Sequence, residues 1–353
     1  MNSLIEKHTL SSNLSVKEAL VKLDGLSSSS VQTLFVLSES DQKVLGSITD
    51  GDIRRGLIGD VQLSDQITQM MNTGCATINM SDFSLLLLDD LRKRKINLIP
   101  IVNESGCIIR LINLKEKKSV LPIDALIMAG GKGSRLKPLT ETIPKPLLKV
   151  DGKPIIEYNV DRLNLFGINN LSISIKYLGE QLIEYFGTGD QHGIKISYVK
   201  EDRALGTIGA LALLENLEND TILIMNSDLL TNIDFEDFYR DFIDQEADMS
   251  IASIPYKVEI PYAILNTEGT EIKSFAEKPT MTYYSNGGIY LLKREHIARI
   301  PKGEFYNATD LMEILIQSKK KVISYPLRGY WLDIGKHDDF TKAQEDVKHI
   351  QFS

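Results

Sequence analysis

Residues 126–140 are Leu-Ile-Met-Ala-Gly-Gly-Lys-Gly-Ser-Arg-Leu-Lys-Pro-Leu-Thr, and Pro144-Lys-Pro-Leu-Leu-Lys-Val150 follows shortly after. An apolar run that ends in a glycine-rich turn predicts a buried strand whose carboxyl end exposes backbone N–H groups. Phosphates bind at this position in open α/β sheets. Arg135 and Lys145 add two cations to the same loop. The stretch therefore favours a nucleoside triphosphate as its ligand.

Two familiar phosphate loops fit this stretch poorly. The dinucleotide fingerprint requires a third glycine where Arg135 stands. The P-loop requires Ser or Thr directly after Gly-Lys, whereas Gly133 separates Lys132 from Ser134. A glycine turn after a core strand, with solvated basic residues, is the alternative interpretation, because such turns are common between elements.

The pattern Gly-Gly-x-Gly-x-Arg-Leu-x-Pro-Leu-Thr, followed by Pro-Lys-Pro-Leu, resembles the signature of the sugar-phosphate nucleotidylyltransferases. The resemblance extends over roughly residues 122–353. It implies that an NTP and a sugar 1-phosphate give an NDP-sugar and pyrophosphate, with Mg²⁺ as cofactor. It also implies an α/β domain of Rossmann-like, GT-A-like architecture. Alternating strand and helix patterns in this part agree with a mostly parallel sheet.

Length and composition limit the class of protein. A chain of 353 residues suggests two or three domains. The net charge of −8 argues against a nucleic-acid-binding protein, which normally has a basic surface. Cys75 and Cys107 lack metal-ligand spacing and indicate free thiols in a reducing compartment. We find no apolar run of membrane-spanning length and no signal-like start, and we therefore expect a cytoplasmic protein.

Residues 1–118 form two similar halves, of about 1–61 and 62–118, followed by a charged break and the transferase domain at 119–353. In each half a helical pattern precedes two strands separated by a polar turn. The helices are expected at 15–23 and 82–94, and the strands at 33–37, 44–49, 98–102 and 107–112. A plan repeated after roughly 60 residues indicates an internal duplication.

This pair resembles a tandem CBS (Bateman) module, an α+β domain pair that typically binds AMP, ADP or ATP and regulates a fused enzyme. The matching stretch is Gly46-Ser-Ile-Thr-Asp-Gly-Asp-Ile53, in which Thr49 and Asp52 would hold the phosphate and ribose of the ligand. A carboxylate can accept both ribose hydroxyls, and a threonine can donate to phosphate. Asn113 and Glu116 occupy these places in the second half, so a pair retained only for dimerisation stays an alternative. We expect a homodimer or higher homo-oligomer.

Two distant carboxylates are the candidate Mg²⁺ ligands. The apolar run 221–225 predicts a central strand that delivers Asn226-Ser-Asp228 to the ligand crevice. The resemblance makes Asp228 the first metal ligand and Asp333, in Trp331-Leu-Asp-Ile-Gly335, the second. Mg²⁺ prefers a few hard oxygens together with water and substrate phosphates. Each aspartate could instead cap a neighbouring helix.

Glu201 stands at the position that contacts the nucleobase in the family. An ionised carboxylate only accepts hydrogen bonds, and guanine offers two adjacent donors, whereas uracil and thymine offer one donor flanked by acceptors. This favours GTP, with a uridylyl or cytidylyl donor as the alternative. The resemblance as a whole assigns nucleotide binding to Leu126, Ala129, Gly130, Gly131, Gly133, Glu201, Gly206 and Thr207.

The sugar side is expected in the last third of the chain. Glu277-Lys-Pro279 and Asn286-Gly-Gly288 match motifs in which Glu277, Asn286 and Gly287 bind the sugar and Lys278 binds its phosphate. The resemblance thus gives a catalytic set of Arg135, Lys145, Asp228, Lys278 and Asp333. The domain order resembles CBS-fused guanylyltransferases of legionaminic acid-type pathways, which favours glucosamine 1-phosphate, with mannose 1-phosphate as rival. A non-catalytic nucleotide-sensing protein is the alternative from another class.

Overall fold

The computed structural model describes residues 2–26, 31–79, 83–350 and 352, and the chain divides into two compact units, Met1–Val120 and Leu121–Ser353. We call them unit 1 and unit 2 and describe each by itself. Within the described residues, no helix combines the length and the apolar character that a membrane crossing requires.

Unit 1 contains two small sheets with the same strand arrangement. Each has three strands, in the order β1-β2-β3 and β4-β5-β6, and in each the first pair is parallel and the second antiparallel. The elements are α1 (Asn2–His8), β1 (Thr9–Ser11), α2 (Val16–Asp24), β2 (Thr33–Leu37), β3 (Val44–Thr49), α3 (Asp50–Ile58), β4 (Ile78–Asn79), α4 (Leu85–Lys93), β5 (Leu98–Val102) and β6 (Ile108–Asn113).

The predicted helices and strands of this unit are confirmed to within a few residues. Ser15 begins α2 with a capping box to Glu18, and the Ser84 side chain accepts from the N–H of Leu87 at the start of α4. Position 82, where we predicted the start of the second helix, lies outside the described residues. Phe35 of β2 and Leu98 of β5 belong to one buried cluster, so the two halves share a core.

Unit 2 is built on a seven-stranded sheet in the order β11-β10-β7-β12-β17-β14-β18. Only β17 runs against its neighbours, so the predicted mostly parallel sheet is confirmed. The strands are β7 (Asp124–Met128), β10 (Asn170–Ile175), β11 (Lys195–Lys200), β12 (Thr221–Asn226), β14 (Met249–Glu259), β17 (Thr280–Lys293) and β18 (Val322–Pro326).

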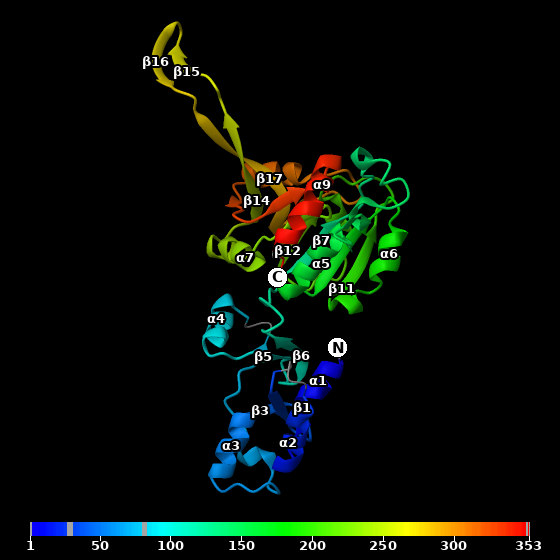
Figure 1. Ribbon diagram of the computed structural model, residues 1–353, viewed down its shortest axis with the longest axis vertical. Coiled ribbons are helices and arrows are strands. Elements are labelled where there is room, and N and C mark those ends of the chain that lie inside the picture. The colour runs from blue at the N-terminus through cyan, green and yellow to red at the C-terminus, as the bar shows by residue number, and fades with distance from the viewer. Residues whose placement is uncertain (1, 27–30, 80–82, 351, 353) are drawn as a thin grey trace. The chain divides into compact units, whose positions relative to one another are not determined.

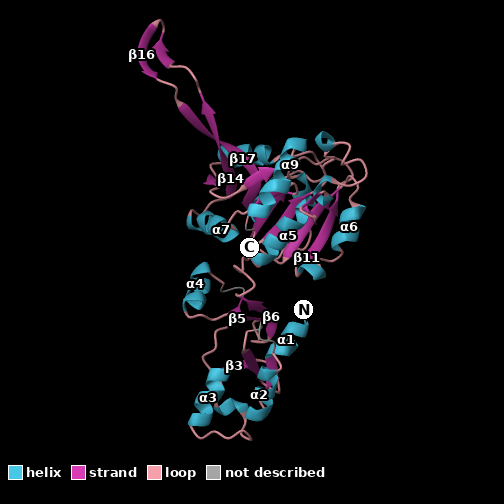
Figure 2. Cartoon of the chain, viewed as in Figure 1, coloured by secondary structure: helices cyan, strands magenta, loops and turns pink. Residues whose placement is uncertain are grey.

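Helices flank this sheet (Figure 2). They are α5 (Ile155–Leu165), α6 (Glu180–Phe186), α7 (Phe235–Asp244), α8 (Ala308–Gln317) and α9 (His337–Asp346). Leu311 and Leu315 of α8 pack with Ile222 and Ile224 of β12 in one buried cluster. A strand whose side chains are covered in this way is nearly all apolar, as β12 is.

The apolar pattern of residues 207–217 predicts a helix, and this prediction is wrong. The structure has only a short 3₁₀ turn there, Gly209–Leu213. The backbone of this segment is engaged elsewhere, because Ile208 N–H donates to the carbonyl of Tyr306 and Tyr306 N–H donates to that of Leu205. These long-range bonds hold the chain in a loop against the start of α8.

Two small elements leave the main sheet. The short strands β13 (Leu229–Thr231) and β19 (Trp331–Asp333) pair with each other. The hairpin of β15 (Ile264–Glu268) and β16 (Glu271–Ala276) continues the line of β14 and β17 and extends away from the body of unit 2 (Figure 1). This projection is a feature that the sequence patterns did not predict.

Candidate active site

The glycine loop begins where β7 ends. Gly133 adopts a φ of +61°, and a Cβ there would lie 2.9 Å from Cβ of Lys145 and 3.0 Å from Cγ2 of Thr140. The Thr140 hydroxyl also donates to the Gly133 carbonyl at 2.9 Å. Glycine is therefore required for the loop to fold back onto the segment that carries Lys145.

Two nucleotide-binding candidates, one in β7 and one directly after it, are buried. Leu126 is fully buried in the core, and Ala129, directly after the strand, is 1% exposed. The Ala129 N–H donates to the carbonyl of Ser174 at 3.0 Å. Their side chains support the strand from inside and offer no surface to a ligand, whereas Gly130 and Gly131 follow in the open loop.

The fold brings Asp228 and Asp333 together although they are far apart in the sequence. Asp228 follows β12, and Leu229 of β13 pairs with Asp333 of β19. Ile334 N–H also donates to the backbone carbonyl of Asp228 at 3.1 Å. Burial and the negative charge of Asp228 raise the pKa of the Asp333 carboxyl. Such a rise is expected when two carboxylates share a partly buried site.

Two cations accompany these carboxylates. The Lys145 ammonium forms an ion pair with Oδ2 of Asp228, and Lys145 is only 8% exposed. The Arg135 guanidinium lies against the turn after β19, where a Cβ on Gly335 would be 3.3 Å from Nη1 of Arg135. Both cations act to lower the pKa of Asp333, which partly offsets the burial. Four of the five predicted catalytic residues thus lie together.

The residues present fit a magnesium ion. Oδ1 of Asp333 is buried and has no hydrogen-bond partner, which leaves a desolvated oxygen that needs a cation. Asp228 supplies a second carboxylate beside it. Hard carboxylate oxygens of this kind are the protein donors that Mg²⁺ prefers.

Two further groups of possible ligands occur in the described part of the chain, and each has a structural explanation. In the first, Asp248 accepts from Lys321 N–H at 2.8 Å and contacts Nε2 of His296 at 2.9 Å. In the second, Asp161 forms an ion pair with Lys153. Neither group lies at the strand ends that carry the glycine loop.

Glu201 faces the glycine loop from the end of β11. A Cβ on Gly130 would lie 3.0 Å from Oε1 of Glu201, and the other oxygen, Oε2, accepts from Leu205 N–H at 3.3 Å. The carboxylate is thus held next to the loop that we predicted to bind the triphosphate.

Gly206 and Thr207 have contacts of another kind. Gly206 has a φ of +75°, and a Cβ there would lie 2.6 Å from the carbonyl oxygen of Tyr306. The Thr207 hydroxyl accepts from Ala308 N–H at 2.7 Å, at the start of α8. These two residues therefore fix the loop against α8, a structural role beside the predicted one.

The two predicted sugar motifs are placed differently. Asn286 accepts from Gly288 N–H at 2.9 Å, and a Cβ on Gly288 would lie 2.5 Å from Nδ2 of Asn226. The Trp331 indole donates to the carbonyl of Gly287 at 2.8 Å. The Asn286 motif therefore adjoins both strand ends that carry the aspartates. Sequence reasoning missed the positioning contacts of Asn226 and Trp331, although both residues stand in motifs that it used.

Glu277 and Lys278, in contrast, are exposed and lie between β16 and β17 on the projecting segment (Figure 1). The structure does not bring them to the aspartates.

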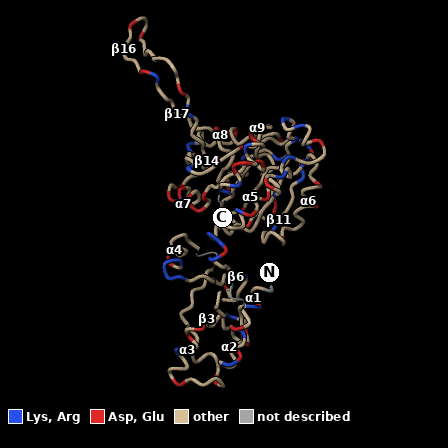
Figure 3. The backbone as a smooth tube through the Cα atoms, in the orientation of Figure 1, with Lys and Arg blue, Asp and Glu red and all other residues tan. Residues whose placement is uncertain are grey.

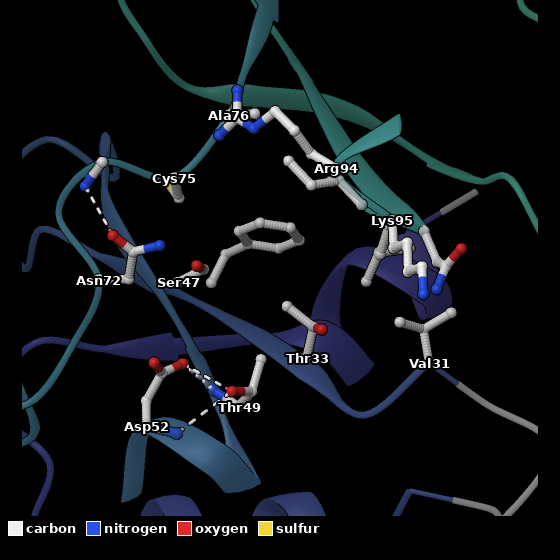
Figure 4. Close-up of a pocket in the computed structure, with 15 residues that line it drawn as sticks. Val31, Thr33, Ser47, Thr49, Asp52, Asn72, Cys75, Ala76, Arg94 and Lys95 are labelled. Carbon is white, nitrogen blue, oxygen red and sulfur yellow. Dashed lines mark hydrogen bonds between the residues drawn. The ribbon is translucent and has the colours of Figure 1, made fainter. Parts of the chain in front are cut away.

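Unit 1 contains a pocket of its own, of about 290 Å³ (Figure 4). Thr49 and Asp52 line it at the start of α3, where Oγ1 of Thr49 donates to Oδ2 of Asp52 at 2.7 Å. Arg94 and Lys95 reach the same pocket from the second half of the unit. The pocket therefore combines carboxylate, hydroxyl and cationic groups from both halves.

Comparisons with known proteins identify the class of unit 2. The family model described as "Nucleotidyl transferase" matches residues 124–350, and the chain belongs to this family. The predicted transferase family and α/β fold are thereby confirmed.

Two curated relatives and one solved structure show the range of the family. A mannose-1-phosphate guanylyltransferase of Mycobacterium tuberculosis is 31% identical over 236 residues, 64% of this chain and 64% of that protein. This chain thus spans less than two thirds of that relative. A D-glycero-α-D-manno-heptose 1-phosphate guanylyltransferase of Aneurinibacillus thermoaerophilus is 31% identical, over 64% of this chain and 99% of the relative. The crystal structure of a candidate glucose-1-phosphate thymidylyltransferase of Bacillus anthracis has a TM-score of 0.54 and 25% identity, over 65% of this chain and 97% of that one.

Proposed function

We propose that the chain transfers a nucleotidyl group from an NTP to a sugar 1-phosphate and releases pyrophosphate. The observation that carries the proposal is the convergence of Arg135 and Lys145 with Asp228 and Asp333 beside the glycine loop. Anionic substrates need local positive charge in an acidic protein, and this is the arrangement that supplies it. The family match over unit 2 gives the same reaction class.

The chemistry follows from charge and requires no general base. The sugar phosphate is already an anionic nucleophile, and its obstacle is repulsion by the triphosphate. Arg135, Lys145 and the N–H groups of Gly130 and Gly131 bind phosphate oxygens and hold the α-phosphorus for in-line attack. Asp228 and Asp333 would hold Mg²⁺, which supplies Lewis-acid neutralisation of phosphate oxygens when bound.

GTP is the favoured donor. Glu201 accepts hydrogen bonds next to the glycine loop, as recognition of the N1–H and N2 amine of guanine requires. The two curated relatives described above are guanylyltransferases, which supports this choice. UTP or CTP is the rival donor. Glucosamine 1-phosphate and mannose 1-phosphate are the proposed acceptors, and the mycobacterial relative favours mannose.

The test is pyrophosphate release over a grid of five nucleoside triphosphates and several sugar 1-phosphates, with Mg²⁺. We expect turnover with GTP and with one of the two proposed acceptors. Asp228→Asn should lower turnover by about 10²–10³-fold, the effect of losing one electrostatic group. Asp244→Asn, at an exposed position of α7, is the matched control and should leave turnover unchanged. If no pair of substrates gives pyrophosphate release, with or without AMP, ADP and ATP, the result would favour the non-catalytic nucleotide-sensing protein.

A specific observation favours a second function, in unit 1. We propose that this unit is a tandem CBS module that binds an adenine nucleotide and regulates the transferase. The matching strand arrangement of its two sheets and the pocket shared by both halves support this proposal. Asp52 would accept the ribose hydroxyls, Thr49 would contact a phosphate, and Arg94 would offset the phosphate charge.

Calorimetric titration of the full chain with AMP, ADP and ATP tests the second function. We expect Asp52→Asn to weaken binding by about tenfold or more, because one charge-assisted hydrogen bond is worth about 1.5–3 kcal/mol. Asp24→Asn changes an exposed carboxylate of the same unit and serves as control. Equal affinities for the two variants would refute the assignment of this pocket.

A further inference from the structure

The most exposed part of unit 2 is a long two-stranded ribbon, residues 254–285, formed by the outer ends of β14 and β17 and by the hairpin β15–β16 (Figure 1). Its aromatic side chains are largely open to solvent, for example Tyr256 at 64% and Phe275 at 68%. An isolated two-stranded hairpin is marginally stable in water. We therefore expect a ribbon of this length to be stabilised by packing against another surface.

The inner part of the ribbon is apolar on one face. Cross-strand partners share a face, and the pairs Tyr256–Tyr283 and Val258–Met281 alternate along the strands, so these four side chains lie on one side. The other side carries Lys257 beside Thr282 and Glu259 beside Thr280, with Tyr284 beside Pro255 at its base.

The hairpin repeats this division. Leu265 pairs with Phe275 and Thr267 with Ile272 on one face, whereas Glu268 pairs with Glu271 on the other. Leu265 and Ile272 are 52% and 55% exposed. An exposed apolar stripe rich in Tyr, Phe and Met is typical of a protein–protein interface.

The charges of the ribbon indicate a second copy of the same chain as the occupant. Both signs occur along it (Figure 3). The lysines are Lys257, Lys273 and Lys278, and the glutamates are Glu259, Glu268, Glu271 and Glu277. Two such ribbons related by a twofold axis can set opposite charges against each other, whereas a ribbon of one sign would repel its own copy.

The candidate active site points to the same occupant. Lys278 is the third cation of the predicted catalytic set, yet it is exposed and lies between β16 and β17, in the segment that projects from the body of unit 2 (Figure 1). Asn286, at the base of the same ribbon, stays beside them. The sugar-phosphate end of each site is thus incomplete within one copy.

We propose that the ribbon docks on a second copy of this chain, so that Lys278 and Glu277 of one copy complete the sugar-phosphate end of the site in the other. The docking itself stands on the apolar stripe and the mixed charges. The delivery of Lys278 rests on the proposed function.

The oligomeric state tests the docking without any enzymatic readout. In sedimentation velocity the full chain should be a dimer or a multiple of it, and Phe275→Ser should shift it toward the monomer. Phe305→Ser is the matched control, because Phe305 lies outside the ribbon and is similarly exposed, at 62%. A monomeric wild type, or equal effects of the two variants, would overturn the docking.

A mixed dimer tests the delivery. One copy carries Lys278→Ala and the other Asp228→Asn, with different affinity tags. If Lys278 acts across the interface, the first copy keeps its aspartates and receives an intact ribbon, so the mixed dimer should regain about half of the wild-type turnover. If Lys278 acts in its own chain, both sites stay defective and turnover stays at the level of the single variants, which would overturn the delivery.

A third measurement separates this proposal from the proposed function. A photocrosslinking amino acid at position 278 of an isotopically labelled copy should attach to unlabelled peptides that contain Asp228 or Asp333. This readout needs no turnover. Crosslinks confined to the labelled copy would overturn the delivery even if the enzyme is active, whereas crosslinks between copies in a protein without turnover would contradict only the proposed reaction.

Discussion

The ion pair between Lys145 and Asp228 should be worth much more than an ordinary surface pair. The side chains of Lys145 and Asp228 are only 10% and 20% exposed. Lys145→Met keeps most of the aliphatic volume and removes the charge. Removal of one partner from a buried pair destabilises a protein by about 3–5 kcal/mol, because the other charge stays uncompensated. Since Asp228 keeps some contact with water, we expect the lower end, about 3 kcal/mol.

Urea unfolding without divalent metal, followed by the fluorescence of Trp331, measures this change. Trp331 is the single tryptophan of the chain and lies in unit 2, so the signal reports on that unit. With a urea dependence of about 3 kcal/mol per M, the midpoint should fall by about 1 M.

Lys200→Met is the matched control for this experiment. Lys200 pairs with Glu180 at 2.7 Å, but their side chains are 63% and 77% exposed. Such a pair contributes at most about 1 kcal/mol, or about 0.3 M in the midpoint. Adding Asp333→Asn to Lys145→Met should recover part of the loss, because it removes the charge that then repels Asp228. Equal midpoints for the two lysine variants would refute the reasoning.

Three further outcomes are expected. The pKa of Asp333 is raised by burial and by Asp228, so the folded state holds the proton more tightly than the unfolded state and ionisation destabilises the fold. Metal-free Asp333→Asn should therefore have a higher free energy of unfolding than wild type above that pKa. This difference should disappear as the pH falls through the pKa. A pH-independent difference in urea midpoints would contradict the reasoning. Glu201→Gln should lower the GTP-over-UTP ratio of kcat/KM, because an amide donates as well as accepts, and an unchanged ratio would remove Glu201 from base recognition. Gly206→Ala should lower the free energy of unfolding in urea by about 2–4 kcal/mol, because φ is +75° and a Cβ would lie 2.6 Å from the Tyr306 carbonyl oxygen. Gly131→Ala is the control and should unfold like wild type, because a Cβ there would have nothing within 4 Å.

Local patterns were sufficient for most helices and strands. Ser15 and Glu18 form the capping box that begins α2, and a box of this kind involves only four neighbouring residues. The apolar run that became β12 is likewise visible without any knowledge of its neighbours. Such signals depend only on a few neighbouring residues, so the sequence alone is sufficient to predict these elements.

Predictions that depended on distant partners were less successful. The segment after Thr207 has an apolar pattern compatible with a helix, but its backbone and the Thr207 hydroxyl are bound to residues at the start of α8. The pairing of Lys145 with Asp228 also depends on contacts between distant parts of the chain. Nothing in the local sequence of residues 254–285 indicates that these strands leave the sheet and project.

The same distinction explains why the family resemblance located one end of the candidate site better than the other. Asp228 follows the end of β12, and Asp333 ends β19, which pairs with β13 directly after Asp228, so strand pairing brings the two carboxylates together. Lys278 stands on the ribbon, which projects from the body of unit 2 (Figure 1). A matching motif there preserves the residue but not its position. Strand pairing therefore sets the positions of the two aspartates, whereas the position of Lys278 follows from the course of the ribbon.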